Sequence, residues 1–423
     1  MKNGLAALIL AAGRGTRMNS EYPKVLHEAA GLPLLEHVLG EVREAGIRKI
    51  AVVVGESDHQ LSSLIRQFGA NQIWQKERLG TGHAVMQAER LFSKWPGGLL
   101  ILPADAPCIS ADTLRSLIET AARSEASAVV LTAEVENPHG YGRILRDNGR
   151  VAGIREELDA SPRERLISEI NSGIYFFDAP SLFQSLRDVK KNQLKKEYYL
   201  TDAVESLVRS GQKVHALKTP NEKEIMGVNT RKELAEAHQM LNERELNRHS
   251  KAGVTILDPA KTVIASGVRI GRDTVIHPFT WIERDVTIGA KCQIGPFAKI
   301  RSGVCVDDEA VIGSFVELVR THIGRKTFVK HLSYLGDAKI GRNVNVGAGT
   351  ITANFDGTKK HTTVVEDHVR LGCDTILIAP VKVGRGAKTG AGAVICAGQS
   401  VPKGKTVIGV PARVLGKQNR KRK

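Results

Sequence analysis

The first residues whose types and spacing could do chemistry lie within residues 5–24. An unbroken apolar run leads into two nearby glycines, Gly13 and Gly15, and Arg17 and Lys24 follow in the same stretch. Glycines let backbone N–H groups approach a phosphate closely, and the arginine and lysine add fixed positive charge along a phosphate chain. We therefore predict that this stretch binds a phosphorylated ligand.

Other interpretations of the same stretch fit less well. A dinucleotide-binding turn would have a third glycine at Met18, and a P-loop would continue into Gly-Lys-Ser or Gly-Lys-Thr. The run from Leu5 to Ala12 also imitates the apolar part of a secretory signal, but no clear small-residue cleavage site follows it. Removal of such a signal would also destroy the arrangement of arginine and lysine.

The elements that would position this loop are strands and helices that alternate along the first half of the chain. A short apolar run closed by glycines predicts a buried strand of a parallel sheet, and the loop after such a strand lies at the edge where α/β sheets bind ligands. Further buried strands are predicted at residues 50–54, 99–102 and 128–132, and helices at residues 34–42 and 61–68. The first half of the chain therefore predicts a three-layer α/β domain, Rossmann-like, with a mostly parallel sheet.

Asp105 follows the predicted strand 99–102 within the string Pro-Ala-Asp-Ala-Pro. An aspartate at a strand end is often only a turn former, but this one falls at the same sheet edge as the glycine loop, which favours a metal carboxylate. The first half contains other short polar motifs, and each of them, considered alone, is more often structural than functional. Their candidate site residues are Gln75, Gly80, Thr81, Gly142, Glu156, Asn171 and Asn229.

The second half of the chain has a different pattern, in which an aliphatic residue recurs every six residues. The series is Ile264, Ile270, Ile276, Ile282, Ile288, Ile294, Ile300, Val306 and Ile312. The pattern returns at residues 340–347, 371–372 and 383–384. A strict six-residue period predicts a parallel β-helix, in which each hexad supplies one short side of a triangular coil and its aliphatic residue points to the core.

Two segments of the second half break this period, residues 328–337 and residues 352–364. Insertions into a solenoid form loops, often on the binding face, so we expect both segments to be loops. A lone histidine is more often structural than catalytic. His331 is better placed than most, because it lies in such a break and close to Tyr334.

Composition limits the remaining possibilities. At 423 residues the chain is long enough for at least two domains, and no apolar run approaches membrane-spanning length. Five scattered cysteines without a Cys-x-x-Cys pair argue for a reducing cytoplasm and against a disulfide or zinc framework. A net charge of +16 indicates anionic partners, and phosphorylated small molecules suit it as well as nucleic acid does. Aromatic residues, at 4%, leave little surface on which bases could stack.

The change of pattern also predicts the domain boundaries. Residues 1–229 form the α/β domain, residues 230–250 an amphipathic linker helix, residues 251–416 the β-helix, and residues 417–423 a solvated basic tail. The apolar residues that suggest the linker helix are Leu234, Ala237, Leu241 and Leu246.

The motifs of the first half, in their order and spacing, resemble the N-terminal half of the bifunctional N-acetylglucosamine-1-phosphate uridylyltransferase/glucosamine-1-phosphate N-acetyltransferase family. The resemblance implies a nucleotidyltransferase domain in which Asp105 and Asn229 bind Mg²⁺, with Arg17 and Lys24 catalytic. The uridine nucleotide would be held by Leu10, Ala11, Ala12, Gly13, Gln75, Gly80 and Thr81. The amino sugar would be held by Gly142, Glu156 and Asn171.

The second half resembles the left-handed β-helix acetyltransferase domain of that family, whose members usually form trimers with active sites between subunits. By this resemblance His331 is the general base, Glu317 orients or polarises it, and the backbone at Ala348 stabilises the oxyanion. The sugar phosphate would be held by Arg301, Tyr334, Asn345 and Lys360. The CoA site would be lined by Asn354, Cys373 and Ala391, next to Phe355. The chain departs from the family at four places. Pro103-Ala104 stands where the family commonly has Tyr-Gly, Val319 where it has a phosphate-binding lysine, Phe355 where it has a tyrosine, and Gly409 near the position of a CoA-contacting arginine.

The resemblance implies a cytoplasmic bifunctional enzyme of bacterial UDP-N-acetylglucosamine synthesis, which supplies peptidoglycan and lipopolysaccharide. The C-terminal domain would acetylate glucosamine 1-phosphate from acetyl-CoA, and the N-terminal domain would couple N-acetylglucosamine 1-phosphate to UTP and release pyrophosphate. A second hypothesis is a nucleotidyltransferase alone, with the β-helix as a structural or trimerisation module. A third, nucleic-acid binding through the basic surface, would require salt-sensitive binding that substrate nucleotides do not displace.

Overall fold

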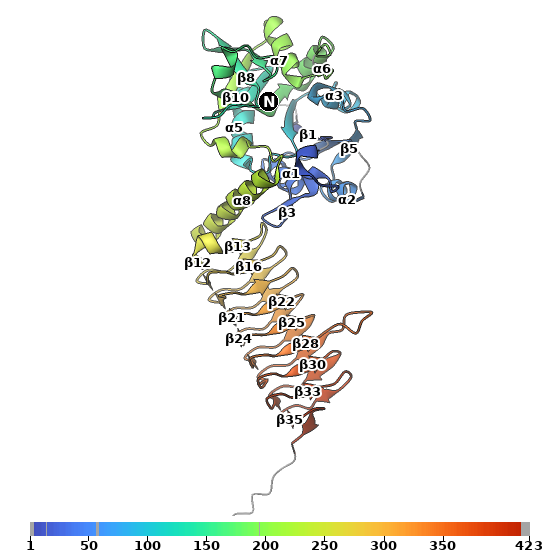
Figure 1. Ribbon diagram of the computed structural model, residues 1–423, viewed down its shortest axis with the longest axis vertical. Coiled ribbons are helices and arrows are strands. Elements are labelled where there is room, and N and C mark those ends of the chain that lie inside the picture. Colours follow the sequence, from blue (N-terminus) through green and yellow to red (C-terminus); the bar gives the residue numbers. More distant parts are fainter. Residues whose placement is uncertain (1–3, 14, 56–58, 194, 416–423) are drawn as a thin grey trace, which may run out of the picture. The chain divides into compact units, whose positions relative to one another are not determined.

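The computed structural model describes residues 4–13, 15–55, 59–193 and 195–415, so the predicted basic tail at residues 417–423 lies outside the described residues. Contacts between Cα atoms divide the chain into two compact units, Met1–His238 and Gln239–Lys423 (Figure 1). Each unit is described by itself. A helix with the length and apolar character of a membrane span is absent from the described residues.

The first unit is built on one twisted sheet of mostly parallel strands. Its strands, in spatial order, are β11 (Val214–Lys218), β7 (Ala128–Glu134), β10 (Glu169–Asp178), β6 (Gly98–Pro103), β1 (Ala6–Ala11), β4 (Lys49–Val54) and β5 (Asn71–Trp74). β10 runs antiparallel to both of its neighbours, and the hairpin β8 (Arg143–Asp147) and β9 (Arg150–Arg155) pairs with it. The strands predicted at residues 50–54, 99–102 and 128–132 are confirmed as β4, β6 and β7.

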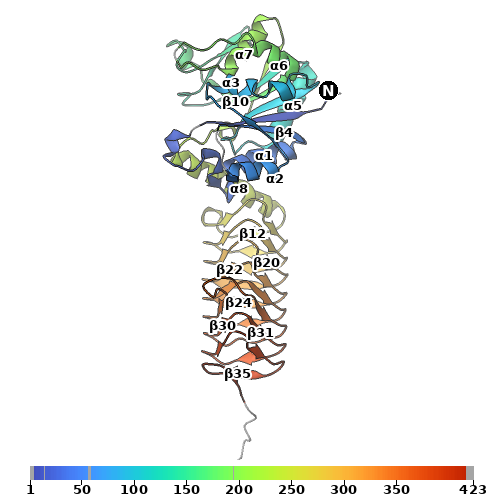
Figure 2. The same cartoon turned by 90° about the vertical axis from the view of Figure 1, so that its right-hand side faces the viewer.

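Helices cover both faces of this sheet, as a three-layer fold requires (Figure 2). The helices of the unit are α1 (Leu34–Glu44), α2 (His59–Gln67), α3 (Thr81–Met86), α4 (Glu89–Phe92), α5 (Ala111–Ser124), α6 (Ala179–Leu186) and α7 (Leu200–Arg209). Alternate residues of β1 enter different cores: Ala7 and Ile9 pack with α1, α2 and α5, whereas Ala6 and Leu8 pack with α3, α6 and α7. Burial on both faces explains why the strand is apolar throughout.

The helix α8 (Arg231–Lys251) follows, and the division between the two units falls inside it, after His238. Ala237, Leu241 and Leu246 are buried, and Leu234 is half-buried. The predicted amphipathic helix at residues 230–250 is therefore present.

The second unit is a left-handed parallel β-helix whose strands stack into three faces. The first face holds β12 (Thr255–Ile256), β15 (Val275–Ile276), β18 (Gln293–Ile294), β21 (Val311–Ser314), β24 (Phe328–His331) and β27 (Asn345–Val346). The second holds β13 (Val263–Ile264), β16 (Trp281–Ile282), β19 (Lys299–Ile300), β22 (Glu317–Val319), β25 (Tyr334–Gly336), β28 (Ile351–Ala353), β30 (Ile376–Ile378) and β33 (Val394–Ile395). The third holds β14 (Arg269–Ile270), β17 (Thr287–Ile288), β20 (Cys305–Val306), β23 (His322–Ile323), β26 (Ala338–Ile340), β29 (Thr363–Val365), β31 (Val381–Val383) and β34 (Ser400–Val401).

The remaining strands of the coil are β32 (Lys388–Thr389), β35 (Thr406–Ile408) and β36 (Arg413–Val414). The predicted hexad residues form the core of the coil, and Ile276, Ile294 and Ile312 are fully buried in it. The hexad prediction is therefore confirmed.

The prediction that residues 328–337 form a loop is wrong. They form β24 and β25, which stay in the coil, and His331 pairs in register with Ser314 of the preceding turn. The apparent break has another cause: two sides of the triangle are five residues long instead of six, from Leu318 to Ile323 and from Leu335 to Ile340. Each short side shifts the six-residue period of the sequence by one residue, while the coil itself continues without a loop.

The second predicted break, residues 352–364, does leave the coil. The chain departs after β28 and returns at β29, and Figure 1 shows the excursion as the orange loop beside β28. An antiparallel bridge between Phe355 and Lys360 closes this loop into a hairpin.

Candidate active sites

The glycine loop and Asp105 meet at the carboxyl ends of β1 and β6. These strands are parallel neighbours, and the Ala104 N–H donates to the Leu10 carbonyl over 3.0 Å just where they end. The loop of Gly13 and Gly15 follows one strand, and Asp105 follows the other. The predicted common sheet edge is therefore confirmed.

Lys24, Asp105 and Asn229 come together at this edge from three distant parts of the chain. The Lys24 ammonium forms an ion pair with the Asp105 carboxylate, and its Nζ donates to Asn229 Oδ1 over 3.1 Å. The Val228 N–H donates to the Asp105 carbonyl over 2.8 Å, which fixes the segment before Asn229 beside β6. Side-chain exposure is only 9% for Lys24 and 20% for Asp105, so the pair is partly shielded from water.

Gly15 makes room for the Lys24 side chain. Its φ of +63° lies in the left-handed region, and a Cβ there would lie 2.6 Å from Lys24 Cβ. Only glycine adopts this conformation and leaves this space at little cost. Arg17 lies in a short 3-10 helix (Thr16–Met18), and its side chain is exposed.

The oxygen atoms around the Lys24 ammonium fit a hard divalent cation. A carboxylate and an amide oxygen already face one positive charge, and Mg²⁺ typically binds one or two protein oxygens while substrate phosphates and water complete its shell. The donor set is therefore consistent with the expected metal at Asp105 and Asn229.

Gln75, Gly80 and Thr81 lie around the start of α3. Gln75 is buried, and its Nε2 donates to the Gly80 carbonyl over 3.1 Å. Thr81 Oγ1 accepts the Leu200 N–H over 3.1 Å, and a Cβ at Gly80 would lie 2.6 Å from the Tyr198 carbonyl oxygen. Glycine is therefore required at position 80 for the close approach of the Tyr198 backbone.

Gly142, Asn171 and Glu156 form a second group: Gly142 directly precedes β8, Glu156 directly follows β9, and Asn171 lies in β10. The Asn171 N–H donates to the Gly142 carbonyl over 2.8 Å, and the Thr201 hydroxyl donates to Glu156 Oε1 over 3.0 Å. Burial raises the pKa of the Glu156 carboxyl, and the hydrogen bond from Thr201 opposes that rise. The Asn171 side chain also donates to the Tyr175 hydroxyl over 2.6 Å.

Sequence reasoning did not select Tyr175 and Thr201, which orient Asn171 and Glu156. Thr201 stands in a polar string near Tyr198, and that string was visible in the sequence. Tyr175 had no comparable signal, because an aromatic residue in an apolar strand is usually core.

In the second unit, four of the predicted residues stack along one edge of the triangle. His331, Ala348, Cys373 and Ala391 each directly precede a residue with positive φ at the corner between the first and second faces. Hydrogen bonds from the Asp374 N–H to the Ala348 carbonyl (2.7 Å) and from the Gly392 N–H to the Cys373 carbonyl (2.8 Å) link the turns. We call this line of residues the corner edge.

Arg301, Glu317 and Tyr334 lie on or beside the second face. Arg301 Nη1 donates to Glu317 Oε1 over 3.0 Å, and Glu317 pairs in register with Tyr334 of the next turn. A Cβ at Gly336 would lie 2.7 Å from Tyr334 Oη and 2.8 Å from Asn354 Nδ2, so the glycine lets these two side chains meet. The partner of the Glu317 carboxylate is Arg301, and the His331 side chain is exposed.

The other predicted residues lie farther round the coil. Asn345 starts β27 on the first face, with an exposed side chain, whereas Phe355 and Lys360 form the hairpin bridge in the loop after β28. A single chain therefore groups most of the predicted acetyl-site residues along the second face and the corner edge, but places Asn345 on a different face.

Arg320 and Asp337 form a network that sequence reasoning had missed. They occupy the two five-residue sides, where Arg320 Nε and Nη2 donate to the Asp337 carboxylate over 2.6 and 2.8 Å. The Asn354 amide also donates to this carboxylate. The Arg320 guanidinium is the main cause that holds the pKa of Asp337 below its usual value. Arg320 is thus held by Asp337, and the adjacent Val319 is buried.

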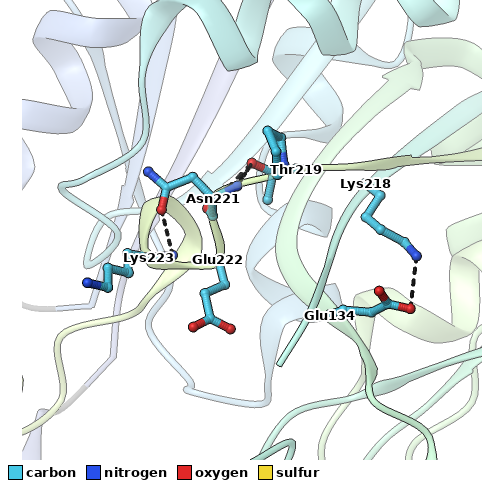
Figure 3. Close-up of a pocket in the computed structure, with 7 residues that line it drawn as sticks. Glu134, Lys218, Thr219, Asn221, Glu222 and Lys223 are labelled. Atoms are coloured by element: carbon cyan, nitrogen blue, oxygen red, sulfur yellow. Dashed lines mark hydrogen bonds and ion pairs between the residues drawn. The ribbon is translucent and has the colours of Figure 1, made fainter. Parts of the chain in front are cut away.

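A shallow pocket in the first unit contains none of the predicted site residues. It is lined by residues 218–223 and Glu134, and Figure 3 shows Lys218 paired with Glu134 over 3.0 Å. The Lys218 ammonium and the Glu134 carboxylate neutralise each other.

Comparison with known proteins covers both halves of the chain. The MobA-like NTP transferase domain matches residues 7–173, and the bacterial transferase hexapeptide model (six repeats) matches residues 285–320. A protein of Geobacillus sp. (strain WCH70) named bifunctional protein GlmU is 43% identical over 98% of this chain and 96% of its own length. Proteins of the same name from Pelotomaculum thermopropionicum and Bacillus subtilis (strain 168) are 43% and 38% identical, over 89% and 98% of this chain and 90% and 97% of their own lengths.

Proposed function

The chain belongs to the family of bifunctional GlmU proteins, and from this premise we propose which of its residues carry the two reactions of the family. It is an N-acetylglucosamine-1-phosphate uridylyltransferase and a glucosamine-1-phosphate N-acetyltransferase of UDP-N-acetylglucosamine synthesis. The alternative of a nucleotidyltransferase with a purely structural β-helix is not favoured, because the bifunctional relatives align over nearly the whole chain.

Uridylyl transfer is assigned to residues 1–229, and the convergence of Lys24, Asp105 and Asn229 is the single observation that supports this assignment most. The phosphate oxygen of N-acetylglucosamine 1-phosphate attacks the α-phosphorus of UTP, a P–O bond forms, and the bond to the departing pyrophosphate breaks. Mg²⁺ held by Asp105 and Asn229 would supply charge neutralisation to the triphosphate. Catalysis then rests on positioning and charge, with Lys24 and Arg17 facing the phosphates.

The substrates would bind on either side of this charged group. The backbone of residues 10–13, together with Gln75, Gly80 and Thr81, would hold the uridine nucleotide. The pair Gly142 and Asn171 would hold the amino sugar with Glu156. In support, each of these groups is fixed by hydrogen bonds from neighbouring segments, so little ordering remains to be done when substrate binds.

Acetyl transfer is assigned to residues 251–416, with residues 230–250 as the linker helix. The amine of glucosamine 1-phosphate attacks the thioester carbonyl of acetyl-CoA, a C–N bond forms, and the C–S bond breaks. His331 would take the proton of the attacking amine, Glu317 would support that charge, and the Ala348 backbone would donate to the oxyanion. The CoA thiolate leaves and is protonated.

Binding groups for this step follow the corner edge and the second face. Arg301, Tyr334, Asn345 and Lys360 would hold the sugar phosphate. Asn354, Phe355, Cys373 and Ala391 would line the acetyl-CoA site. The stacking of Ala348, Cys373 and Ala391 along one edge with His331 supports a single elongated site for an acyl carrier.

A homotrimer is part of this proposal. Asn345 stands on the first face and not on the second, so we propose that a neighbouring subunit brings an equivalent residue to the second face. The corner edge also continues into three exposed aromatic rings, Phe279, Phe297 and Phe315, which stack at centroid distances of 4.7 and 5.0 Å and are each about half exposed. An exposed apolar ridge in line with the site suits burial against another copy of the chain.

We also infer that the enzyme works in the cytoplasm, because the cysteines are scattered and lack the pairing that an oxidising compartment favours. Two coupled assays on the purified chain test the proposed function. Pyrophosphate release from UTP is measured with N-acetylglucosamine 1-phosphate against glucose 1-phosphate, and free CoA thiol is measured with glucosamine 1-phosphate. Light scattering should give three times the chain mass of 45.9 kDa. A monomer at micromolar concentrations would refute the shared acetyl site.

A further inference from the structure

The third face of the β-helix brings together three side chains that sequence reasoning had left unassigned: Cys305, Asp307 and His322. One thiol sulfur, one carboxylate oxygen and one imidazole nitrogen lie within 4.8 Å of one another. His322 Nε2 and Asp307 Oδ1 are already in hydrogen-bond contact at 3.0 Å. The three are partly or fully exposed, and they lie on a different face from Tyr334 and Asn345.

The parallel ladder explains why these side chains meet. Cys305 of β20 stands directly opposite His322 of β23, so both side chains leave the sheet on the same side about 4.8 Å apart along the stack. Val306, between Cys305 and Asp307, is buried, and because neighbouring residues of a strand alternate, Asp307 points outward with Cys305. Residues 17 positions apart in the sequence thus become direct neighbours.

Glycines occupy the positions of the neighbouring turns that stack with Asp307. In the same column of the third face, the turn before has Gly289 and the turn after has Gly324, followed by Gly341. A Cβ at Gly324 would lie 2.5 Å from the Gly341 carbonyl carbon, so a larger residue does not fit there. Asp307, His322, Gly324 and Gly341 line a recess at this place.

We propose that Cys305, Asp307 and His322 form a binding site for a borderline-soft divalent cation of the Zn²⁺ type. One sulfur, one nitrogen and one oxygen are the ligand types of zinc, and three protein ligands leave a fourth tetrahedral position for solvent. Ligand atoms around zinc lie about 3.5 Å apart, so the exposed side chains need move only by about 1 Å. The Cys305 thiol gives its proton to solvent as the sulfur binds the metal.

The charges nearby are mixed. Arg325 pairs with Glu309, which also pairs with Lys326, and Arg342 pairs with Asp367, which also pairs with Arg385, so each carboxylate offsets only part of the positive charge at the recess. Lys339 is the next residue in the row of His322 and contributes a positive charge that weakens the site. Because Cys305 and His322 belong to successive turns, a bound ion would clip the two turns together and stabilise the middle of the coil.

Cobalt titration of the metal-stripped full chain tests the site. Co²⁺ bound by a thiolate gives a near-ultraviolet charge-transfer band, and oxygen-ligated cobalt at Asp105 and Asn229 does not. We expect such a band to saturate at one Co²⁺ per chain and to disappear when Zn²⁺ is added. Cys305→Ser should abolish the band, and His322→Ala should weaken cobalt binding by at least about tenfold, the lower bound for loss of a supporting group.

Cys396→Ser is the matched control, because Cys396 is also partly exposed but lies outside the cluster, and it should keep the band. His322→Gln, which preserves the thiol, provides a second variant if Cys305→Ser folds poorly by circular dichroism. In addition, Zn²⁺ should raise the thermal unfolding midpoint of the wild type and not of His322→Gln. A wild type without a thiolate band, or a band that persists in Cys305→Ser, would overturn the proposal.

Discussion

The Lys24 ammonium lies 3.1 Å from Asn229 Oδ1, although 205 residues separate the two in the sequence. The same ammonium forms an ion pair with Asp105. Two side-chain oxygens and a cation are thus collected at the carboxyl ends of two parallel strands. We propose that this arrangement serves charge neutralisation of a triphosphate, since groups that are already in place need little reorganisation.

Asp105→Ala should remove most uridylyl transfer and leave acetyl transfer intact. The substitution deletes a proposed Mg²⁺ ligand and the partner of Lys24, so we expect a loss on the order of 100- to 1,000-fold, the size of losing one preorganised electrostatic group. Pyrophosphate release and CoA-thiol release are measured on the same preparation. The exposed Asp112→Ala on α5 serves as the control. A parallel fall of both activities in a normally folded protein would contradict separate sites.

Gly15→Ala should reduce uridylyl transfer by displacing Lys24. The new methyl would lie 2.6 Å from Lys24 Cβ, at a φ that costs a non-glycine residue about 1–2 kcal/mol. A shift of the lysine by about 1 Å is expected to cost up to about 100-fold in turnover. Gly40→Ala is the control, because its Cβ would meet no atom within 4 Å. Equal turnover of the two variants would show that the position of Lys24 is unimportant.

His331→Ala should lower acetyl transfer by about 100- to 10,000-fold, the usual contribution of a general base, and leave uridylyl transfer nearly unchanged. The experiment is run at saturating acetyl-CoA over a wide range of glucosamine 1-phosphate. Val319 stands where the family has a phosphate-binding lysine, and the adjacent Arg320, which could replace that lysine, is held by Asp337. The wild type should therefore have a high KM for the acceptor. Equal acetyl-transfer rates of wild type and mutant would remove His331 from the mechanism.

Asp202→Asn should stabilise the first unit at neutral pH but not at pH 4. Burial, followed by the charges of Glu205 and Glu156, raises the pKa of Asp202 from 3.8 to about 6. The unfolded chain therefore ionises this group first, and folding loses stability as pH rises from about 4 to about 6. Asparagine removes the penalty, which we put at about 1 kcal/mol because the side chain is partly exposed.

Thermal unfolding at pH 4 and pH 7.5 measures this difference. The exposed Asp147→Asn in the β8–β9 hairpin is the matched control and should change the midpoint at neither pH. A midpoint of Asp202→Asn that equals the wild-type value at pH 7.5 would show that Asp202 carries no such penalty.

Hydrophobic periodicity determined much of the architecture. Residues 5–12 are apolar because β1 is buried on both faces, and the six-residue period of the second half follows from one inward side chain per side of the coil. The placement of Asp105 beside the glycine loop was also predictable, because parallel strands bring their carboxyl ends to one edge.

Interactions that depend on register could not be predicted in the same way. The five-residue sides that end at Ile323 and Ile340 made residues 328–337 look like an insertion, although their backbone stays in the ladder. A sequence pattern records spacing along the chain, whereas the ladder tolerates one residue fewer at a corner. The bidentate pair of Arg320 and Asp337 at these corners became visible only in the fold.

The sequence by itself therefore determined the two domain types, the glycine loop after the first strand and the repeat, because each is encoded in local composition and period. The tertiary structure decided which side chains meet: Lys24 with Asn229 and Cys305 with His322. These contacts depend on which strands, far apart in the sequence, lie next to each other. That arrangement is set by the energy of the whole core and not by the few residues that it brings into contact.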